Sequence, residues 1–475
     1  MSGGTVLLLL KYKTMKAKTL KNEKDQVVEM ALVRPNAAGI DVGSTIHVVA
    51  VPPGRDEPRV RTFGTLTCHL QEIVNHLKKC RIDSVAMEST GVYWRSLFTV
   101  LVQNGFEVLL VNATQVRNVN GRKNDEDDAM WIQKLHSCGL LKSSYLPDDE
   151  QGALRTFVRF RKSLTEDYSR CILRMQKSLE LMNIKVYKII DDITGKTGTR
   201  IIEAILDGER NPKNFLPFID YRIKVDHDTI AKSLEGNWRE EHLFTLRSSY
   251  ELLKFYKDRI AKCDEEIEQH LQRYEGRQNE GVVEPVKKND GDNNIPDLKK
   301  KNKKKNKNSP AIDIRKYLQN IHGVDVMEIF GISDMSGLQI LSETGTDLSK
   351  WENEKHFTSW LNLSPNIKKT GGKIVSSKLM KRKPNLASQA FRHAANSVQR
   401  SNHWLGDYFR RMKSKGGNIY AVVATAHKIA TIYYKIVRYK EEFKPVDLKQ
   451  YQSQYKKAKI AYLERKLEQL KNDAA

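Results

Sequence analysis

Gly39-Ile40-Asp41-Val42-Gly43 is an apolar run that contains one carboxylate and ends in glycine. This pattern is typical of a β-strand that leads into a tight turn. A second apolar run, Val85-Ala86-Met87-Glu88, also ends on a carboxylate and is followed by Ser89-Thr90-Gly91. Two strands therefore each carry an acidic residue at or near their end.

The segments around these runs alternate between strand and helix patterns. The predicted strands are 39–42, 46–51, 60–65, 84–87 and 106–111, and the predicted helices are 69–79, 93–104 and 125–140. Strands that alternate with helices after an initial three-strand run predict an α/β domain with a mixed sheet over residues 36–149. Such sheets bind ligands at the carboxyl ends of their strands, where Asp41 and Glu88 fall.

The third acidic motif is Lys123-Asn124-Asp125-Glu126-Asp127-Asp128-Ala129, at the start of a predicted helix. Its spacing places Asp125 and Asp128 on one helical face, from which they could converge with Asp41 and Glu88. Clustered carboxylates repel one another unless a cation neutralises them. Oxygen ligands favour Mg²⁺ or Mn²⁺, and two such ions about 4 Å apart catalyse phosphodiester chemistry. These four residues are therefore the candidate metal ligands and catalytic residues.

The charge of the chain favours a polyanionic partner. Its 475 residues include 81 Lys and Arg against 58 Asp and Glu, a net charge of +23, which favours nucleic acid. The five cysteines form no C-x-x-C pair, so the sequence predicts neither a zinc site nor a disulfide framework, and a reducing, cytoplasmic setting fits. The apolar run 6–10 is too short to span a bilayer, so no membrane partner is expected.

Residues 150–275 follow a basic leader (1–35) and the α/β domain, and their pattern predicts long helices. An apolar seam recurs over about four heptads in the second helix, which suggests a helical hairpin or coiled coil. The seam comprises Leu243, Leu246, Tyr250, Leu253, Tyr256, Ile260, Cys263, Ile267, Leu271 and Tyr274. An antiparallel pair within the chain and a dimer interface remain equally open.

The remaining sequence divides into three segments. Residues 276–311 form a Lys/Asn-rich linker that is expected to be disordered and either contacts nucleic acid weakly or serves as solvated filler. Residues 312–440 predict a mostly helical domain, in which Phe330-Gly331-Ile332-Ser333 separates two helices like a helix–hairpin–helix unit. Residues 441–475 predict a charged helical tail.

The acidic set and Lys369-Thr370-Gly371-Gly372-Lys373 together resemble the DEDD transposases, the recombinases of insertion sequences that are guided by a bridge RNA. The resemblance covers about residues 36–150 and 312–440. It rests on the order and spacing of the motifs around Asp41, Glu88 and Asp125, and on the stretch from Trp360 to Arg392.

The resemblance implies an RNase-H-like (RuvC-like) N-terminal domain that carries the four acids, a coiled-coil segment, and a C-terminal transposase domain with a nucleophilic serine. The family often has Ser-Gly where this chain has Thr370-Gly371, so Thr370 is the candidate nucleophile and Ser376 and Ser377 are alternatives. The other interpretation is that Thr370 only caps a glycine turn. The implied partners are DNA, a guide RNA and further copies of the chain as a dimer or tetramer, in a prokaryotic, nucleoid-associated setting.

Basic residues near Thr370 are expected to contact phosphates and to position the nucleic acid without reading its bases. They are Lys368, Lys369, Lys373, Lys378, Lys381, Arg382 and Lys383.

Three other functions fit parts of the sequence. An RNase-H-fold endonuclease or junction resolvase would use the same acids without a covalent intermediate. A non-catalytic nucleic-acid-binding protein would gain nothing from four carboxylates facing a polyanion. The run 39–45 also resembles the first phosphate loop of actin-like and sugar-kinase ATPases, but a second Asp-x-Gly loop in a strand–turn setting is missing from the sequence.

Overall fold

The computed structural model describes residues 31–89, 91–112, 125–279, 309–310, 312–381 and 384–473. The chain divides into two compact units, residues 1–146 and 147–475. Most of the predicted leader and most of the predicted Lys/Asn-rich linker lie outside the described residues.

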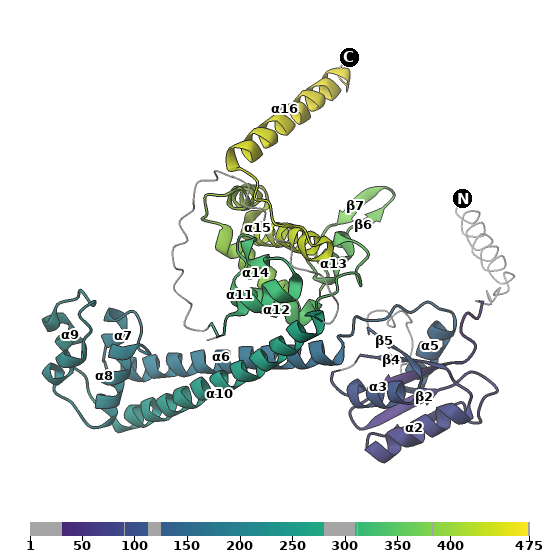
Figure 1. Ribbon diagram of the computed structural model, residues 1–475, viewed down its shortest axis with the longest axis horizontal. Coiled ribbons are helices and arrows are strands. Elements are labelled where there is room, and N and C mark those ends of the chain that lie inside the picture. The colour runs from purple at the N-terminus through teal and green to yellow at the C-terminus, as the bar shows by residue number, and fades with distance from the viewer. Residues whose placement is uncertain are drawn as a thin grey trace, which may run out of the picture. The chain divides into compact units, whose positions relative to one another are not determined.

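The first unit is built on a sheet (Figure 1). This sheet has five strands in the order β3-β2-β1-β4-β5. Its strands are β1 (Ala37–Val42), β2 (Ile46–Ala50), β3 (Val60–Gly64), β4 (Ser84–Glu88) and β5 (Glu107–Val111). The first three strands pair antiparallel, whereas β4 runs parallel to β1 and β5 runs parallel to β4. The predicted mixed sheet is confirmed, and with its flanking helices it is compatible with an RNase-H-like α/β fold.

Helices cover both faces of this sheet. They are α2 (Thr67–Lys79), α3 (Trp94–Gln103) and α5 (Asp125–Ser137). Alternate residues of a strand point to opposite faces, and Ala38, Ile40 and Val42 of β1 join the core that contains residues of α2 and α3. Burial of each large aliphatic side chain in this core contributes about 1.5–3 kcal/mol. The other face of β1, with Gly39 and Asp41, is left for α5.

Gly39 allows α5 to lie directly against β1. A Cβ atom at this position would be 2.2 Å from the backbone nitrogen of Gln133 and 2.5 Å from the carbonyl oxygen of Ala129, both in α5. Hydrogen bonds fix the contact: Gln133 Nε2 donates to the carbonyl oxygen of Ala37 (3.2 Å), and the Ser84 hydroxyl lies 2.7 Å from His136 Nε2. The glycine thus sets the distance between the helix and the sheet.

Two long helices, α6 (Asp149–Leu181) and α10 (Glu240–Asn279), lie side by side in the second unit (Figure 1). The Cys263 thiol, in the second half of α10, contacts the carbonyl oxygen of Phe157 near the start of α6. The Ser178 hydroxyl, near the end of α6, forms a hydrogen bond with the Thr245 hydroxyl near the start of α10. The two helices therefore run antiparallel. A buried ion pair also joins Arg161 of α6 to Asp264 of α10.

Most of the predicted apolar seam of α10 is buried within the chain, and Leu246, Ile267 and Leu271 are fully buried. This burial agrees with the first of the two alternatives, an antiparallel helix pair within one chain. These contacts do not establish a coiled coil, and a dimer interface stays a prediction.

A small helical lobe lies between the two long helices in the sequence. It comprises α7 (Val186–Ile189), α8 (Lys196–Leu206), the 3₁₀ helix η1 (Pro212–Phe218) and α9 (His227–Ser233). Its core includes Ile202, Phe215 and Ile230, which cluster with Leu179 of α6 and Leu246 of α10. The sequence predicted only long helices here, and this lobe was not predicted because its short helices lack a sustained apolar period.

The C-terminal part of the second unit is mostly helical, as predicted. Its helices are α11 (Ile314–His322), the 3₁₀ helix η2 (Val326–Glu328), α12 (Asp334–Thr344), α13 (Glu354–Trp360), α14 (Leu386–Val398), α15 (Trp404–Tyr439) and α16 (Leu448–Asp473). Phe357, Phe391 and Tyr433 form its aromatic core. A two-stranded sheet, β6 (Lys368–Thr370) and β7 (Lys373–Ser376), extends from this core (Figure 1).

The turn before α12 shows why Phe330-Gly331-Ile332-Ser333 separates two helices. Gly331 adopts φ +95°, which favours glycine, and a Cβ there would lie 2.5 Å from the carbonyl oxygen of Ala394. Ser333 then caps α12 through a reciprocal capping box with Ser336. Further along this helix, the fully buried Glu343 pairs with Arg155 (2.9 Å) and Arg159 (2.7 Å) of α6. The C-terminal helices are thereby tied to the long helical pair.

We expect Gly39→Ala to destabilise the first unit by about 1–3 kcal/mol, because the new methyl group meets backbone atoms of α5 that cannot rotate away. Denaturant unfolding would measure the loss. Gly152→Ala is the control: it lies in α6, a Cβ there meets nothing within 4 Å, and alanine should stabilise that helix by up to about 1 kcal/mol. Equal losses in the two variants would contradict the packing argument.

Candidate active site

Asp41 and Glu88 lie at the same edge of the sheet, where the parallel strands β1 and β4 end. The register pairs Gly39 with Ala86 and Ile40 with Met87, so Asp41 and Glu88 occupy the next level on neighbouring strands. Side chains two residues apart in a strand point to the same face of the sheet. Asp41 and Glu88 therefore lie on the same face as Gly39 and Ala86, which is the face that α5 covers. Both are half-buried.

Asp125 and Asp128 approach this edge from α5. Asp125 begins the helix and is exposed, whereas Asp128, one turn later on the same face, is half-buried. The contact of α5 with Gly39 holds the helix over β1 and thereby brings its first turn towards Asp41. The neighbouring motif residues Thr90, Lys123 and Asn124 lie outside the described residues.

Electrostatics link all four acids. The pKa of Asp41 is raised from 3.8 to about 6, and the largest cause is burial. The negative charges of Asp125, Glu88 and Asp128 contribute in that order, while a backbone hydrogen bond at Val42 acts in the opposite direction. The structure therefore brings Glu88, Asp125 and Asp128 close enough to Asp41 for each of them to raise its pKa.

The donor chemistry of this set fits a hard divalent cation, since carboxylates offer only oxygen ligands. The arrangement is open: no three of these acids bring ligand atoms within 4.8 Å of one another, whereas Asp56, His76 and Cys80 do so elsewhere in the described part of the chain. A cation among the four carboxylates would offset the repulsion that adds to burial in raising the pKa of Asp41.

Thr370 occupies the hairpin formed by β6 and β7. It ends β6 and pairs with Lys373, and Gly371 and Gly372 form the two-residue turn with φ of +55° and +77°. Two successive positive φ angles define a tight hairpin turn that glycine favours. Thr370 and Ser377 are exposed, and Ser376 is half-buried. This position leaves both interpretations of Thr370, nucleophile and turn residue, open.

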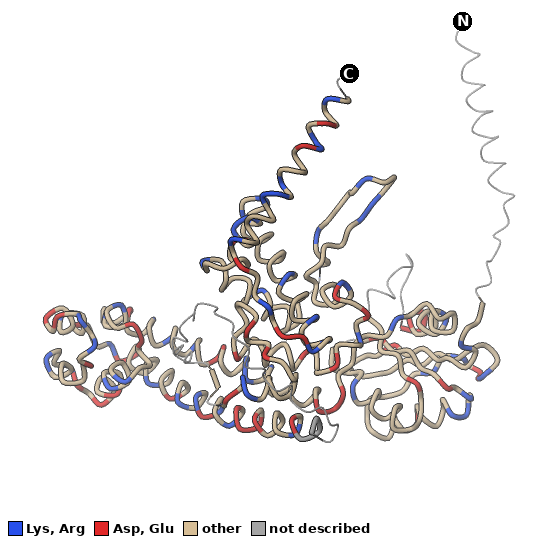
Figure 2. Tube along the Cα trace, turned by 45° about the horizontal axis from the view of Figure 1, so that its top comes forward, with Lys and Arg blue, Asp and Glu red and all other residues tan. Residues whose placement is uncertain are grey.

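Lysines follow this hairpin and its continuation (Figure 2). The exposed ones are Lys368, Lys369, Lys373, Lys378 and Lys381; Arg382 and Lys383 lie outside the described residues. The hairpin also exposes the apolar side chains of Ile374 and Val375. Its surface therefore offers positive charge together with apolar contact area.

Gly39 and Gln133, which hold α5 against β1 beside the acidic cluster, were not predicted from the sequence to have this role. A glycine inside a strand often marks a close approach of another backbone, so the signal was present at Gly39. No comparable signal identified Gln133, because its role depends on a carbonyl group in a distant strand.

Two family models match the chain. A transposase model, DEDD_Tnp_IS110, matches residues 38–184, which include all four acids. A second model, described as the transposase IS116/IS110/IS902 family, matches residues 325–410, which include Thr370 and the β6–β7 hairpin. The chain belongs to the IS110 family of DEDD transposases. No curated protein matches it.

Membership makes the chain a transposase of an insertion sequence, an enzyme that cleaves and rejoins DNA. This finding favours a transposase over the ATPase and non-catalytic alternatives. Across the part of the chain that the structure describes, no helix has the length and apolar character needed to cross a membrane.

We expect Asp41 to lower the stability of the metal-free transposase as pH rises from 3.8 to about 6. Between these pKa values the unfolded chain has released the carboxyl proton and the folded protein retains it, so stability falls there and then levels off above the folded-state pKa. Asp41→Asn should therefore raise the thermal midpoint more at about pH 8 than at about pH 5.

Glu126→Gln is the matched control for this measurement. Glu126 is exposed in the same helical turn, and it is not among the groups that shift the pKa of Asp41. If Asp41→Asn raises the thermal midpoint equally at both pH values, the raised pKa of Asp41 would be contradicted.

Proposed function

We propose that this transposase cuts and rejoins DNA strands with one or two divalent ions held by Asp41, Glu88, Asp125 and Asp128. The observation that carries the proposal is the placement of the four acids: the register of β1 and β4 sets Asp41 beside Glu88, and the contact of α5 with Gly39 brings the first turn of α5 towards them. The raised pKa of Asp41, to which the other three carboxylates contribute after burial, agrees with this placement. DEDD transposases usually use divalent metals, and an oxygen-only ligand set favours Mg²⁺ or Mn²⁺. When bound, the ions would polarise the scissile phosphate and stabilise the leaving oxygen.

In this proposal the Thr370 hydroxyl is the nucleophile. Its oxygen would bond to phosphorus as the bond from phosphorus to the 3′ oxygen breaks, and the hydroxyl proton would leave as the 3′ oxygen gains one. The DNA would then be joined to the protein, and attack by a new 3′ end would reverse the step and complete strand exchange. The exposure of Thr370 and its place before Gly371, where the family often has Ser-Gly, support this role.

The lysines of the hairpin support a role in positioning nucleic acid. Their charges would contact phosphates and fix the register without reading bases. Target choice would then come from a guide RNA, as the resemblance implies, and the net charge of +23 suits two polyanionic partners. We also propose that the α6–α10 pair contributes to a dimer or tetramer.

The nucleophile is tested by trapping a protein–DNA adduct in the presence of Mg²⁺. Thr370→Ala and Asp41→Asn should each abolish the adduct, because one removes the attacking oxygen and the other a ligand. DNA binding should be little changed, since the lysines remain. Denaturing gels with labelled DNA would separate the adduct from free strands.

Thr370→Ser is the rescue variant and should retain the adduct, since serine supplies the same hydroxyl without the methyl group. An adduct that persists in Thr370→Ala would move the role to Ser376 or Ser377. Cleaved ends without any adduct in the native protein would instead support the endonuclease or resolvase alternative.

RNA guidance predicts that RNA transcribed from beside the coding region co-purifies with the protein at moderate salt. Nuclease treatment and sequencing of the bound RNA would identify it, and light scattering would count the chains in the same sample. Random cellular RNA, bound in proportion to its abundance, would argue for charge-driven binding alone.

A further inference from the structure

Asp56, His76 and Cys80 form a compact cluster in the first unit that the proposed reaction does not use. Asp56 lies in the connection between β2 and β3, while His76 and Cys80 lie four residues apart at the end of α2. In the antiparallel register of β1 and β2, Ala50 at the end of β2 pairs with Gly39 of β1. His47 near the start of β2 pairs with Val42 at the end of β1. The connection after β2 therefore leaves the sheet at the edge opposite to that of Asp41.

The ligand atoms of the three side chains all lie within 4.8 Å of one another. His76 Nδ1 is 3.8 Å from Asp56 Oδ2 and 3.8 Å from Cys80 Sγ. In a tetrahedral zinc site, bond lengths of about 2.0–2.3 Å put neighbouring ligand atoms about 3.4–3.6 Å apart. The two distances from His76 exceed this separation by a few tenths of an ångström, and the Asp56 oxygen and Cys80 Sγ lie within 4.8 Å of each other. Small side-chain movements would bring the three atoms to three corners of such a tetrahedron.

The surroundings suit a preorganised site. Cys80 is 1% exposed, and the side chains of His76 and Asp56 are 8% and 9% exposed. The Phe63 ring lies 5.6 Å from the His76 ring and restricts its orientation. Arg61 Nε donates to Asp56 Oδ2 at 2.5 Å, and carboxylates that bind metals commonly accept such a supporting hydrogen bond.

We propose that Asp56, His76 and Cys80 bind a single zinc-class divalent ion that clips the β2–β3 connection to the end of α2. Thiolate and imidazole ligands select zinc-class metals, whereas the carboxylate-only set at the other edge favours magnesium. Binding releases the Cys80 thiol proton to solvent and involves no redox change. Three protein ligands leave a fourth position for water.

The absence of a C-x-x-C pair argued against zinc at the level of sequence. The ligands here come instead from one helical turn and a separate loop, a combination that only the fold brings together. The role of the ion would be structural, so this inference stands independently of the proposed function.

The test is a titration of the full-length protein with Co²⁺ and then Zn²⁺, in excess Mg²⁺ so that the acidic set is already occupied. Cobalt bound to a thiolate gives a charge-transfer absorption in the near ultraviolet, which carboxylate sites do not produce. We expect about one equivalent of Co²⁺ to produce this band and Zn²⁺ to bleach it. Zn²⁺ should also raise the thermal midpoint of the native protein.

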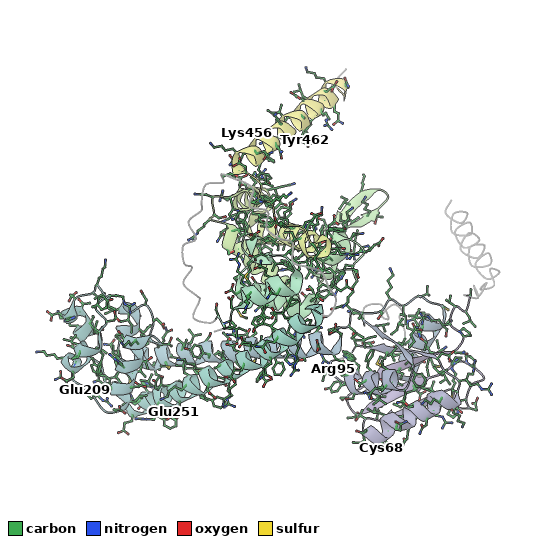
Figure 3. The ribbon with its side chains drawn as sticks, in the orientation of Figure 1. Cys68, Arg95, Glu209, Glu251, Lys456 and Tyr462 are labelled. Atoms are coloured by element: carbon green, nitrogen blue, oxygen red, sulfur yellow. The ribbon has the colours of Figure 1, made fainter. Side chains whose placement is uncertain are left out.

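Cys80→Ser should lose the band, and Cys68→Ser should keep it. Cys68 is the matched control because it lies on the same helix but is exposed at the other end (Figure 3). Circular dichroism would verify that the variants are folded. If Cys80→Ser does not fold, Asp56→Asn, which changes only the loop ligand, should weaken Zn²⁺ binding at least tenfold. No band in the native protein, or a band that persists in folded Cys80→Ser, would overturn the proposal.

Discussion

The approach of α5 to β1 at Gly39 is the constraint on which the acidic cluster depends. Carboxylates on a free chain would separate, because each added negative charge raises the free energy of the others. Here the strand register fixes Asp41 beside Glu88, and the contact of Gly39 with the backbone of α5 fixes the helix above them. Packing and hydrogen bonds elsewhere in the unit therefore hold together four groups that repel one another.

This arrangement stores electrostatic free energy that a bound cation would release. Burial is the largest cause of the raised pKa of Asp41, and the three neighbouring carboxylates add to it; protonation of Asp41 and binding of a cation would both relieve this repulsion. If the site binds divalent ions as proposed, its affinity for them would depend on the integrity of this end of the sheet. Metal binding at this site, as proposed, would also explain why a basic transposase, whose overall charge favours polyanions, keeps four carboxylates close together.

The second unit uses buried ion pairs for a different purpose. Arg161 joins α6 to Asp264 of α10, and the fully buried Glu343 joins α12 to two arginines of α6. Removing one partner of such a pair leaves a buried charge, so these contacts impose a specific alignment on long helices that apolar packing alone would allow to slide. The β6–β7 hairpin, by contrast, is mostly exposed, as its proposed contact with nucleic acid requires.

The sequence by itself determined the mixed sheet, the helices that flank it and the mostly helical C-terminal part, because strand and helix periods and turn residues are local signals. It also indicated the four acids as candidate ligands, and their role as metal ligands stays a prediction. It did not determine the lobe between α6 and α10, whose short helices are stabilised by contacts with distant residues. Nor did it decide whether the α10 seam is buried within the chain, because an apolar seam does not specify its partner. Only the tertiary structure brought His76 and Cys80 to Asp56, and α5 to Gly39. These contacts join segments that are far apart in the sequence, and a local pattern of apolar residues does not specify which segments pack together.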